Sequence, residues 1–407
     1  MSEAISLLVN GREYGGWLSA QVVSGLQQIA TQFAVEVTER YPGGTIRIRP
    51  GDRVVVMIGE TTVATGYVDR VPVSYDASSV SHSVSGRSMT ADLADCCVET
   101  GIETGTKAAQ KQTDSGRYAG IEYQADGTKI DTTASRSTVS AAATGSQWQR
   151  IDVGQTIAAM LRPYGLKLKT DLFGVMTVDK ISVSVGTKVS DAIKQLVQKL
   201  SLIATDDEFG NLVLWSPQHA VRATDSIAVS AAGLPTNVLS GSCDFNYESV
   251  YSDYVVFGQT KADKSDAAGG SANVFSDVVH CGVLGNRHRV IKLFESGSLT
   301  KAAADRRAAF ESSYRLGSAK AATYTVQGWR QSDGSLWRKG LLVAVKDEIL
   351  GFDDEMIIQR VTYNLSESGT TAALELVPAI TLQTAESSGW QGVSGAAAPV
   401  GATSEED

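Results

Sequence analysis

The sequence predicts a β-rich α+β fold with several domains, in which a barrel-like β segment lies near each end of the chain. A length of 407 residues corresponds to roughly two to four domains. Short segments in which apolar and polar residues alternate, as in strands, occur throughout residues 5–86 and again around 323–377. Helical periodicity appears twice between these two regions. The composition, 43% hydrophobic and 20% charged, is that of a globular protein able to bury several cores.

The first segment reads as short strands separated by turns. Phe33, Val35 and Val37 fall on one face of a strand, and Val54–Ile58 is a continuous apolar run. Strands at such close spacing are typical of a small barrel or sandwich. A brief helix is expected to follow, with Thr90 as its N-cap.

Residues 99–146 differ in composition, because Thr, Ser, Ala and Gly replace large apolar residues. We expect an insertion that projects from the body of the protein. Within it, residues 131–145 also fit a linker.

Residues 151–215 carry two helical stripes and a hairpin. The first stripe ends at Tyr164-Gly165, where the glycine suits a helix C-cap. The second has Ile193, Leu196 and Val197 at helical spacing. The hairpin of 202–205 and 212–215 turns at an acidic run that is too short for an EF-hand.

The last third of the chain predicts an extended strand at 251–258, an exposed loop at 261–272 and a surface helix near 300–316 that ends at Gly317. A terminal hairpin is expected from 356–363 and 371–377.

The stretch 323–345 is the most distinctive part of the sequence. A strand leads into Trp329, the turn Ser332-Asp333-Gly334 and Trp337, and a second apolar strand follows. We interpret the two tryptophans as core anchors of a β element. The alternative is an exposed platform for a sugar or a base.

Composition and motifs give no support to an enzyme. The four histidines, His82, His219, His280 and His288, lack metal-site spacing, and His280-Cys281 beside His288 lacks a fourth ligand. The group Arg287-His288-Arg289 fits either an anion site or a solvated strand edge. We expect no catalytic residue, no metal and no cofactor.

The chain is also expected to be made in the cytoplasm. Its four cysteines form neither a disulfide framework nor a CxxC pair, and it has no secretory signal. No apolar run approaches the length of a membrane helix, so no membrane insertion is expected. A net charge of -9 disfavours a surface that wraps nucleic acid.

A series of short motifs in chain order resembles the hub protein of Mu-type contractile phage baseplates, whose hub fold is shared with type VI secretion spike proteins. The motifs are Gly16-Trp17, Thr65-Gly66-Tyr67-Val68-Asp69, Val84-Ser85-Gly86-Arg87, Pro163-Tyr164-Gly165-Leu166, Tyr254-Val255-Val256-Phe257-Gly258 and Gly328-Trp329-Arg330-Gln331-Ser332-Asp333-Gly334-Ser335-Leu336-Trp337. Each motif alone is weak evidence, and the resemblance rests on their common order along the chain. We take eight residues as its structural signature, in core or turn positions and not as a ligand site: Trp17, Gly66, Gly86, Gly328, Trp329, Asp333, Gly334 and Trp337.

The resemblance implies a structural protein of the virion, a homotrimeric hub with two similar antiparallel β-barrel ring domains per chain and smaller α/β domains. Such a hub joins the sixfold tail tube and other baseplate proteins above to the threefold membrane-piercing spike below, and DNA passes through its lumen without specific binding. The alternative function is a carbohydrate-binding or adhesion module that uses exposed tryptophans.

The predicted domain boundaries follow from the pattern and the resemblance together. They are 1–98 (first ring β-barrel), 99–146 (Ser/Thr/Gly-rich insertion), 147–205 (α/β domain with two helices), 206–240 with 318–380 (second ring β-barrel), 241–317 (peripheral α/β domain with a helix near 300–316) and 381–407 (flexible acidic tail).

Overall fold

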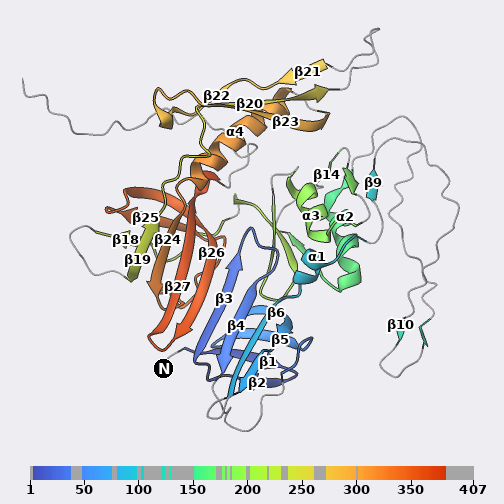
Figure 1. Ribbon diagram of the computed structural model, residues 1–407, viewed down its shortest axis with the longest axis vertical. Helices are drawn as coiled ribbons and strands as arrows, with labels where there is room; N and C mark the ends of the chain where they lie inside the picture. Colours follow the sequence, from blue (N-terminus) through green and yellow to red (C-terminus); the bar gives the residue numbers. More distant parts are fainter. Residues whose placement is uncertain are drawn as a thin grey trace, which may run out of the picture.

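The structure is a computed structural model of the whole chain (Figure 1). It describes residues 3–37, 48–75, 80–98, 102–104, 122–123, 129–130, 151–170, 177–178, 181–183, 186–198, 202–217, 220–230, 237–260, 272–298 and 301–381. Most of the predicted insertion (99–146), most of the predicted loop at 261–272, and the tail after Thr381 lie outside these residues.

One large, mainly antiparallel sheet of 14 strands dominates the fold. Its strands from the N-terminal part of the chain are β1 (Ile5–Val9), β2 (Arg12–Tyr14), β3 (Ser19–Gly25), β4 (Gln32–Val37), β5 (Arg53–Ile58), β6 (Thr61–Arg70), β7 (Val73–Tyr75) and β8 (Val80–Ser88). Those from later in the chain are β18 (Ile227–Val229), β19 (Val238–Cys243), β24 (Ala322–Gln327), β25 (Leu342–Asp347), β26 (Phe352–Ser366) and β27 (Gly369–Pro378). The main path runs β19-β24-β27-β26-β3-β4-β8-β6-β5-β1-β2.

The pairing of β3 with β26 joins the two distant segments of the chain. The two strands are antiparallel, with Ala20 opposite Leu365 and Gly25 opposite Arg360. A single hydrophobic core contains side chains from both segments, including Val22 and Leu374. The structure is therefore β-rich α+β with large antiparallel sheets, while closure into two separate barrels stays a prediction.

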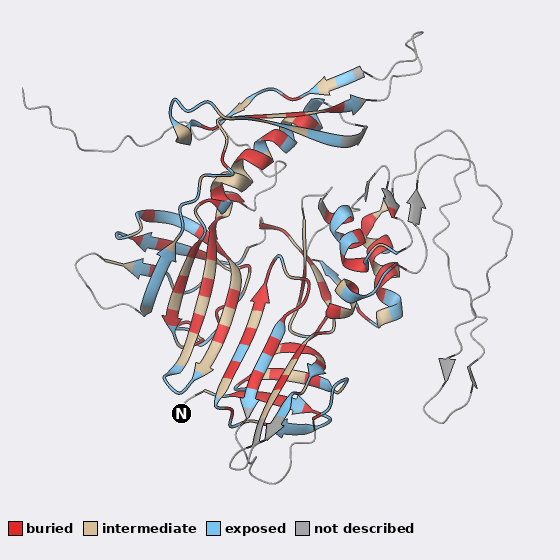
Figure 2. Ribbon diagram, viewed as in Figure 1, coloured by how far each residue is buried: buried red, intermediate tan, exposed pale blue. Residues whose placement is uncertain are grey.

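The two faces of this sheet differ in character. Along β3, β4, β26 and β27 buried and less buried residues alternate, as Figure 2 shows. The buried positions, such as Val22, Phe33 and Tyr363, enter the core. The opposite positions carry mostly small polar side chains, and this face is called the polar face below.

Strands β6 and β8 approach each other too closely for side chains at two glycines. A Cβ atom on Gly66 would lie 1.9 Å from Arg87 O, and one on Gly86 would lie 2.1 Å from Tyr67 O. Because real Cβ atoms do not approach so closely, both positions require glycine.

A smaller unit packs beside the large sheet with its own core (Figure 1). Its helices are α1 (Ala91–Asp95), α2 (Val153–Leu161), the 3-10 turn η1 (Arg162–Tyr164) and α3 (Val189–Gln198). Its main sheet is β13 (Leu168–Thr170), β17 (Leu212–Trp215) and β16 (Ile203–Asp206), in that order. Thr90 precedes α1, but its side chain makes no capping bond, since its hydroxyl pairs instead with Ser88 Oγ at 2.9 Å.

The hairpin of β16 and β17 belongs to the sheet of this smaller unit. Both strands pair within the sheet that contains β13, and neither pairs with the C-terminal strands. The start of the second ring domain at residue 206 stays a prediction. Among the described residues, the first strand after this hairpin is β18, which pairs with β25.

Four short strands pair in twos: β9 (Ile102–Thr104) with β15 (Ile181–Val183), and β12 (Ile151–Asp152) with β14 (Thr177–Val178). Within the predicted insertion, β10 (Glu122–Tyr123) pairs with β11 (Lys129–Ile130).

The third unit is a small sheet backed by a long helix. Strand β20 (Asp253–Thr260) is central, with β21 (Ala272–Phe275) and β22 (Val279–His280) antiparallel to it and β23 (Val290–Ser298) parallel to it. The 3-10 turn η3 (Gly282–Leu284) lies between β22 and β23. Helix α4 (Lys301–Ser318) packs against β20, and this unit is called the peripheral unit below.

Helix α4 differs from its prediction in two ways. It buries Ala304 and Ala308 completely, so it is not a surface helix on all sides. It also continues through Gly317 to Ser318. A Cβ atom at Gly317 would lie 1.7 Å from Thr381 Oγ1 in the 3-10 turn η4 (Ala379–Thr381), so this glycine permits a close contact and does not end the helix. In the described part of the chain, no helix has the length and apolarity needed to cross a membrane.

Candidate functional site

The tryptophans of the signature lie in the main core. Trp17 is 7% exposed, Trp329 1% and Trp337 0%. All three belong to the core that the two β segments share. Because Trp329 and Trp337 present no ring face to solvent, the alternative of an exposed tryptophan platform is wrong at these two residues.

A tight loop between β24 and β25 positions these two tryptophans. The backbone N–H of Trp337 donates to Trp329 O at 3.0 Å. Gly328 and Gly334 adopt φ angles of 77° and 83°, which side chains with a Cβ atom rarely adopt. The glycines of the signature therefore set the path of the loop.

Arg330, in the same loop, connects it to the N-terminal segment. Its guanidinium pairs with the carboxylate of Glu3. It also donates to Ile58 O at 3.1 Å, to Thr61 Oγ1 at 3.2 Å and to Gly334 O at 2.7 Å. Sequence reasoning missed this role, since these partners lie about 270 residues or more from Arg330 except Gly334.

Asp333 organises the turn of the loop. Its Oδ1 accepts from the backbone N–H of Ser335 at 2.8 Å and from the hydroxyl of Ser335 at 2.6 Å, and its Oδ2 accepts from Thr224 Oγ1 at 2.6 Å. These bonds, first of all that from the Ser335 hydroxyl, lower the pKa of Asp333 from 3.8 to about 2. The ionised form is thus the one that the fold stabilises.

This lowered pKa predicts a loss of stability in acid. Because the pKa of Asp333 is lower in the folded than in the unfolded chain, its contribution is complete above about pH 4 and disappears as the pH falls toward 2. Urea unfolding at successive pH values should show a steeper acid loss for the wild type than for Asp333→Asn. A Glu367→Gln control at the β26–β27 turn should keep the wild-type profile, and equal profiles for wild type and Asp333→Asn would contradict the assignment.

A buried ion pair lies where the N-terminal, middle and C-terminal parts of the chain meet. Asp206, 2% exposed, accepts from Lys339 Nζ at 2.5 Å. Its other oxygen accepts from the backbone N–H of Thr31 at 2.7 Å and from Ser88 Oγ at 2.6 Å. We call Thr31, Ser88, Asp206 and Lys339 the junction.

Further hydroxyl groups complete the hydrogen bonding around the junction. Lys339 Nζ also donates to Thr205 Oγ1 at 2.8 Å, and the hydroxyls of Ser24 and Thr31 lie 2.9 Å apart. The side chains of Lys339 and Asp206 are 13% and 1% exposed. A buried charge pair needs such additional bonds to offset its desolvation. The junction therefore fixes three parts of the chain in one arrangement.

The histidine cluster of the sequence is completed by Asp253, which sequence reasoning did not select. His280 Nδ1 lies 2.6 Å from Asp253 Oδ1, and His288 Nδ1 lies 3.5 Å from Asp253 Oδ2. The hydroxyl of Ser252 and then the histidines lower the pKa of Asp253. Both imidazoles use Nδ1 on this carboxylate, and Cys281 is buried in a separate small core. Among the described residues, no group of His, Cys, Asp and Glu is arranged to hold a metal ion.

The neighbouring Arg289 has a structural role. Its guanidinium donates to Tyr247 O at 3.0 Å and to Glu248 O at 2.6 Å, and it lies 4.8 Å from the centre of the Tyr251 ring. These contacts occupy the group that an anion site would need.

Models of three protein families match the chain in order. The N-terminal domain of Mu phage baseplate assembly protein GpP-like matches residues 4–88, the second domain of baseplate hub protein gp44-like matches 138–216, and the fourth domain of Mu phage baseplate assembly protein GpP matches 300–383. The junction takes Thr31 and Ser88 from the first of these regions, Asp206 from the second and Lys339 from the third.

Individual relatives extend the similarity to nearly the whole chain. Baseplate hub protein gp44 of Escherichia phage Mu is 25% identical over 396 residues, which cover 93% of this chain and 88% of gp44. The 43 kDa tail protein of prophage MuSo2 from Shewanella oneidensis has a similar structure, with a TM-score of 0.70, 24% identity and coverage of 94% of this chain and 99% of that one. A tail protein from Neisseria meningitidis MC58 also gives a TM-score of 0.70, at 17% identity, with 94% and 100% coverage.

The sequence motifs, the family matches and the fold agree with one another. The matches cover the two β segments and the middle unit in chain order. The chain is therefore similar along nearly its whole length to the gp44-like baseplate hub proteins of Mu-type contractile phage tails, which form a structural family and not an enzyme family.

Proposed function

We propose that three copies of the chain form the ring at the centre of the baseplate, that this ring joins the sixfold tail tube to the threefold spike, and that DNA passes through it during ejection. The observation that carries the proposal is the large sheet, which has one buried face, one polar face and an end strand at each side of its main path. In the described residues, β19 and β2 end the main path without a further partner strand. The end strands of a sheet can pair with those of another copy, and closed rings are the usual outcome of symmetric assembly.

The polar face has the composition that a DNA passage requires. The strand registers bring together small or uncharged side chains from β24, β27, β26, β3, β4 and β8. They are Gln21, Gln32, Ala34, Ser85, Thr323, Thr325, Thr362, Asn364, Thr371 and Ala373. Such groups offer weak hydrogen bonds and no fixed charge to a passing phosphate backbone.

The cations of this face are already paired. On the described residues of these six strands, Arg87 and Arg360 are the only lysines or arginines. Arg87 pairs with Asp69 at 2.6 Å and with Asp95 at 2.7 Å, and Arg360 pairs with Glu375 at 2.8 Å. Because phosphate binding depends on available Lys and Arg, this face is suited to line a channel through which DNA slides without adhering.

Light scattering on a size-exclusion column tests the ring. The purified chain is expected to give three times its mass of 43.0 kDa. The double variant Gln21→Lys/Thr362→Lys, which adds cations to the polar face, should keep this mass but slow DNA ejection from assembled tails. The matched control Gln155→Lys/Gln195→Lys, on the exposed sides of α2 and α3, should eject DNA normally.

Two outcomes would contradict the proposal. A strict monomer at all concentrations, both alone and mixed with the spike protein, would remove the trimeric ring. Unchanged DNA ejection by the Gln21→Lys/Thr362→Lys variant would remove the polar face from the channel wall, even if the trimer were found.

A further inference from the structure

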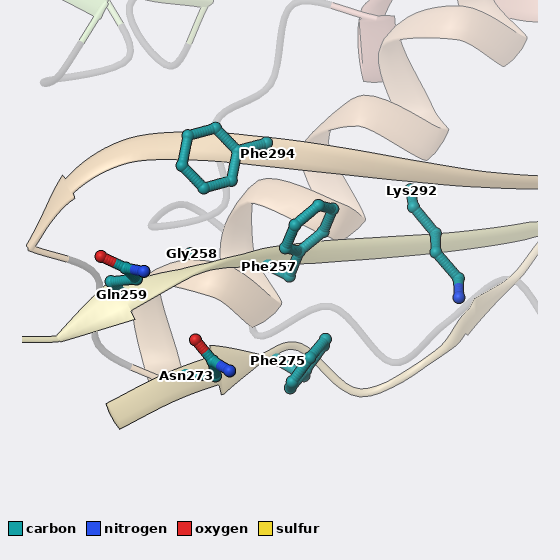
Figure 3. A pocket seen from close by; sticks show the side chains of 7 residues that line it. All are labelled: Phe257, Gly258, Gln259, Asn273, Phe275, Lys292 and Phe294. Atoms are coloured by element: carbon teal, nitrogen blue, oxygen red, sulfur yellow. The ribbon is translucent and has the colours of Figure 1, made fainter. Parts of the chain in front are cut away.

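The outer face of the peripheral unit carries a row of three phenylalanines (Figure 3). Phe257 on β20 is the register partner of Phe275 on β21 and of Phe294 on β23. The ring centres of Phe257 and Phe275 are 6.0 Å apart, and those of Phe257 and Phe294 are 5.5 Å apart. We call these three residues the aromatic row.

The packing of this unit does not require the aromatic row. Side chains at the alternate positions, Val256, Val274 and Leu293, pack against Ala304 and Ala308 of α4. Since neighbouring strand residues point to opposite faces, the aromatic row lies on the face away from the helix. There Phe275 remains 54% exposed and Phe294 63% exposed.

The segment between β20 and β21 contains no large apolar residue. Residues 261–271 consist only of Lys, Ala, Asp, Ser and Gly. Large aromatic side chains exposed next to one another on a soluble protein mark an interaction surface. We therefore expect the aromatic row to bind an apolar partner other than this segment.

The edge of the same sheet is also open. In the described residues, β23 pairs with β20 alone, so one side of this nine-residue strand has no backbone partner. Long apolar edge strands are normally protected, and an open one accepts a strand from another chain. Phe294 lies on this edge strand, beside the open side.

The size of the surface indicates a narrow occupant. The exposed parts of Phe275 and Phe294 amount to on the order of 200–300 Å², whereas a stable interface between globular partners buries about 800 Å² on each side. The hollow beside the rings has a volume of about 320 Å³ and is lined at its margins by Gln259, Asn273 and Lys292. A single extended peptide fits this surface better than a second globular copy.

We propose that the aromatic row and the open edge of β23 bind an extended segment of another baseplate protein. The segment adds as a strand to β23, so its alternate side chains lie over the row. Apolar side chains cover Phe275 and Phe294, and a carboxylate lies opposite Lys292, which lines the hollow. The proposal depends on the chain being a baseplate component and not on the trimer or the DNA channel.

Hydrogen–deuterium exchange on the full-length chain tests the strand addition. The backbone amides of Ile291–Phe294 are expected to exchange more slowly in isolated tails than in the purified protein. Equal exchange in both samples would overturn the proposal. Slow exchange that is already present in the purified protein and is lost on dilution would overturn it as well, because the occupant would then be a second copy of this chain.

A matched pair of variants tests the aromatic row. Phe275→Ser/Phe294→Ser should keep the solution mass and the melting temperature of the wild type, because both rings are largely exposed. Its incorporation into tails should fall by roughly tenfold or more, as expected when two aromatic anchors are removed. The control Ile349→Ser, 69% exposed in the turn between β25 and β26, should incorporate normally.

Wild-type incorporation of the double variant would overturn the proposal, and a changed solution mass would instead implicate contacts between copies. A photo-crosslinking residue at position 294 identifies the occupant in assembled tails. The expected cross-link joins it to one extended segment of a different baseplate protein. A cross-link to this chain's own sequence would overturn the proposal.

Discussion

Replacing Lys339 by methionine is expected to lower the free energy of unfolding by about 3–5 kcal/mol. The change leaves Asp206, which is 2% exposed, buried without its cation. Thr31 and Ser88 still donate to this carboxylate, but they carry no charge to balance it. Chemical denaturation of the purified chain, followed by circular dichroism, gives the free energy directly.

The neighbouring residue supplies a matched control. Arg338 pairs with Glu208 at 3.4 Å, and the two side chains are 46% and 32% exposed. Because exposed ion pairs contribute at most about 1 kcal/mol, Arg338→Met should change stability little. If Lys339→Met and Arg338→Met cost the same, the buried pair does not hold the junction together.

A double variant separates the pair from general damage to the site. Adding Asp206→Asn to Lys339→Met removes the unbalanced charge, so part of the lost stability should return. If the double variant is no more stable than Lys339→Met alone, the loss comes from packing around the lysine stem rather than from the charge.

Local patterns in the sequence predicted the elements that depend on neighbouring residues. The alternation of Phe33 and Val35 placed β4 correctly, and the spacing of Ile193, Leu196 and Val197 placed α3. The terminal hairpin was also found, although β26 and β27 are longer than the predicted strands. Periodicity fixes which face of an element is apolar, and that is sufficient for these predictions.

Long-range pairing could not be predicted in the same way. The bond between Gln21 and Asn364 joins residues 343 positions apart, and the junction joins Lys339 to Asp206 across 133 positions. The alternation of apolar and polar residues shows that a strand has an apolar face. It does not show which strand lies beside it. The single core shared by the two β segments could therefore not be predicted from this alternation.

The aromatic row could not be predicted from the sequence, for the same physical reason. Phe257, Phe275 and Phe294 each read as an ordinary strand residue, and only the register of three strands places them side by side. The sequence did contain one indication. An aliphatic residue, Val256, Val274 or Leu293, directly precedes each phenylalanine, so the phenylalanines point to the opposite face of the sheet. Without the position of α4, the sequence did not say which face was covered.

Replacing either signature tryptophan, Trp329 or Trp337, by alanine should lower the stability equally. Replacing them by phenylalanine should lower it by different amounts. Trp329→Ala and Trp337→Ala are each expected to cost about 3–5 kcal/mol of stability, because both rings are almost completely buried in the shared core. The indole N–H of Trp329 donates to Asn364 O and to Thr371 O at 3.1 Å each, whereas that of Trp337 has no described partner.

Phenylalanine keeps most of the ring volume and removes the indole N–H. Trp329→Phe should therefore be less stable than Trp337→Phe by on the order of 1 kcal/mol, the usual contribution of a hydrogen bond. Denaturation curves of the four variants measure both effects. Equal stability of the two phenylalanine variants would mean that the bonds to Asn364 and Thr371 do not anchor the loop. A Trp337→Ala variant as stable as the wild type would contradict the anchoring role of this side chain in the shared core.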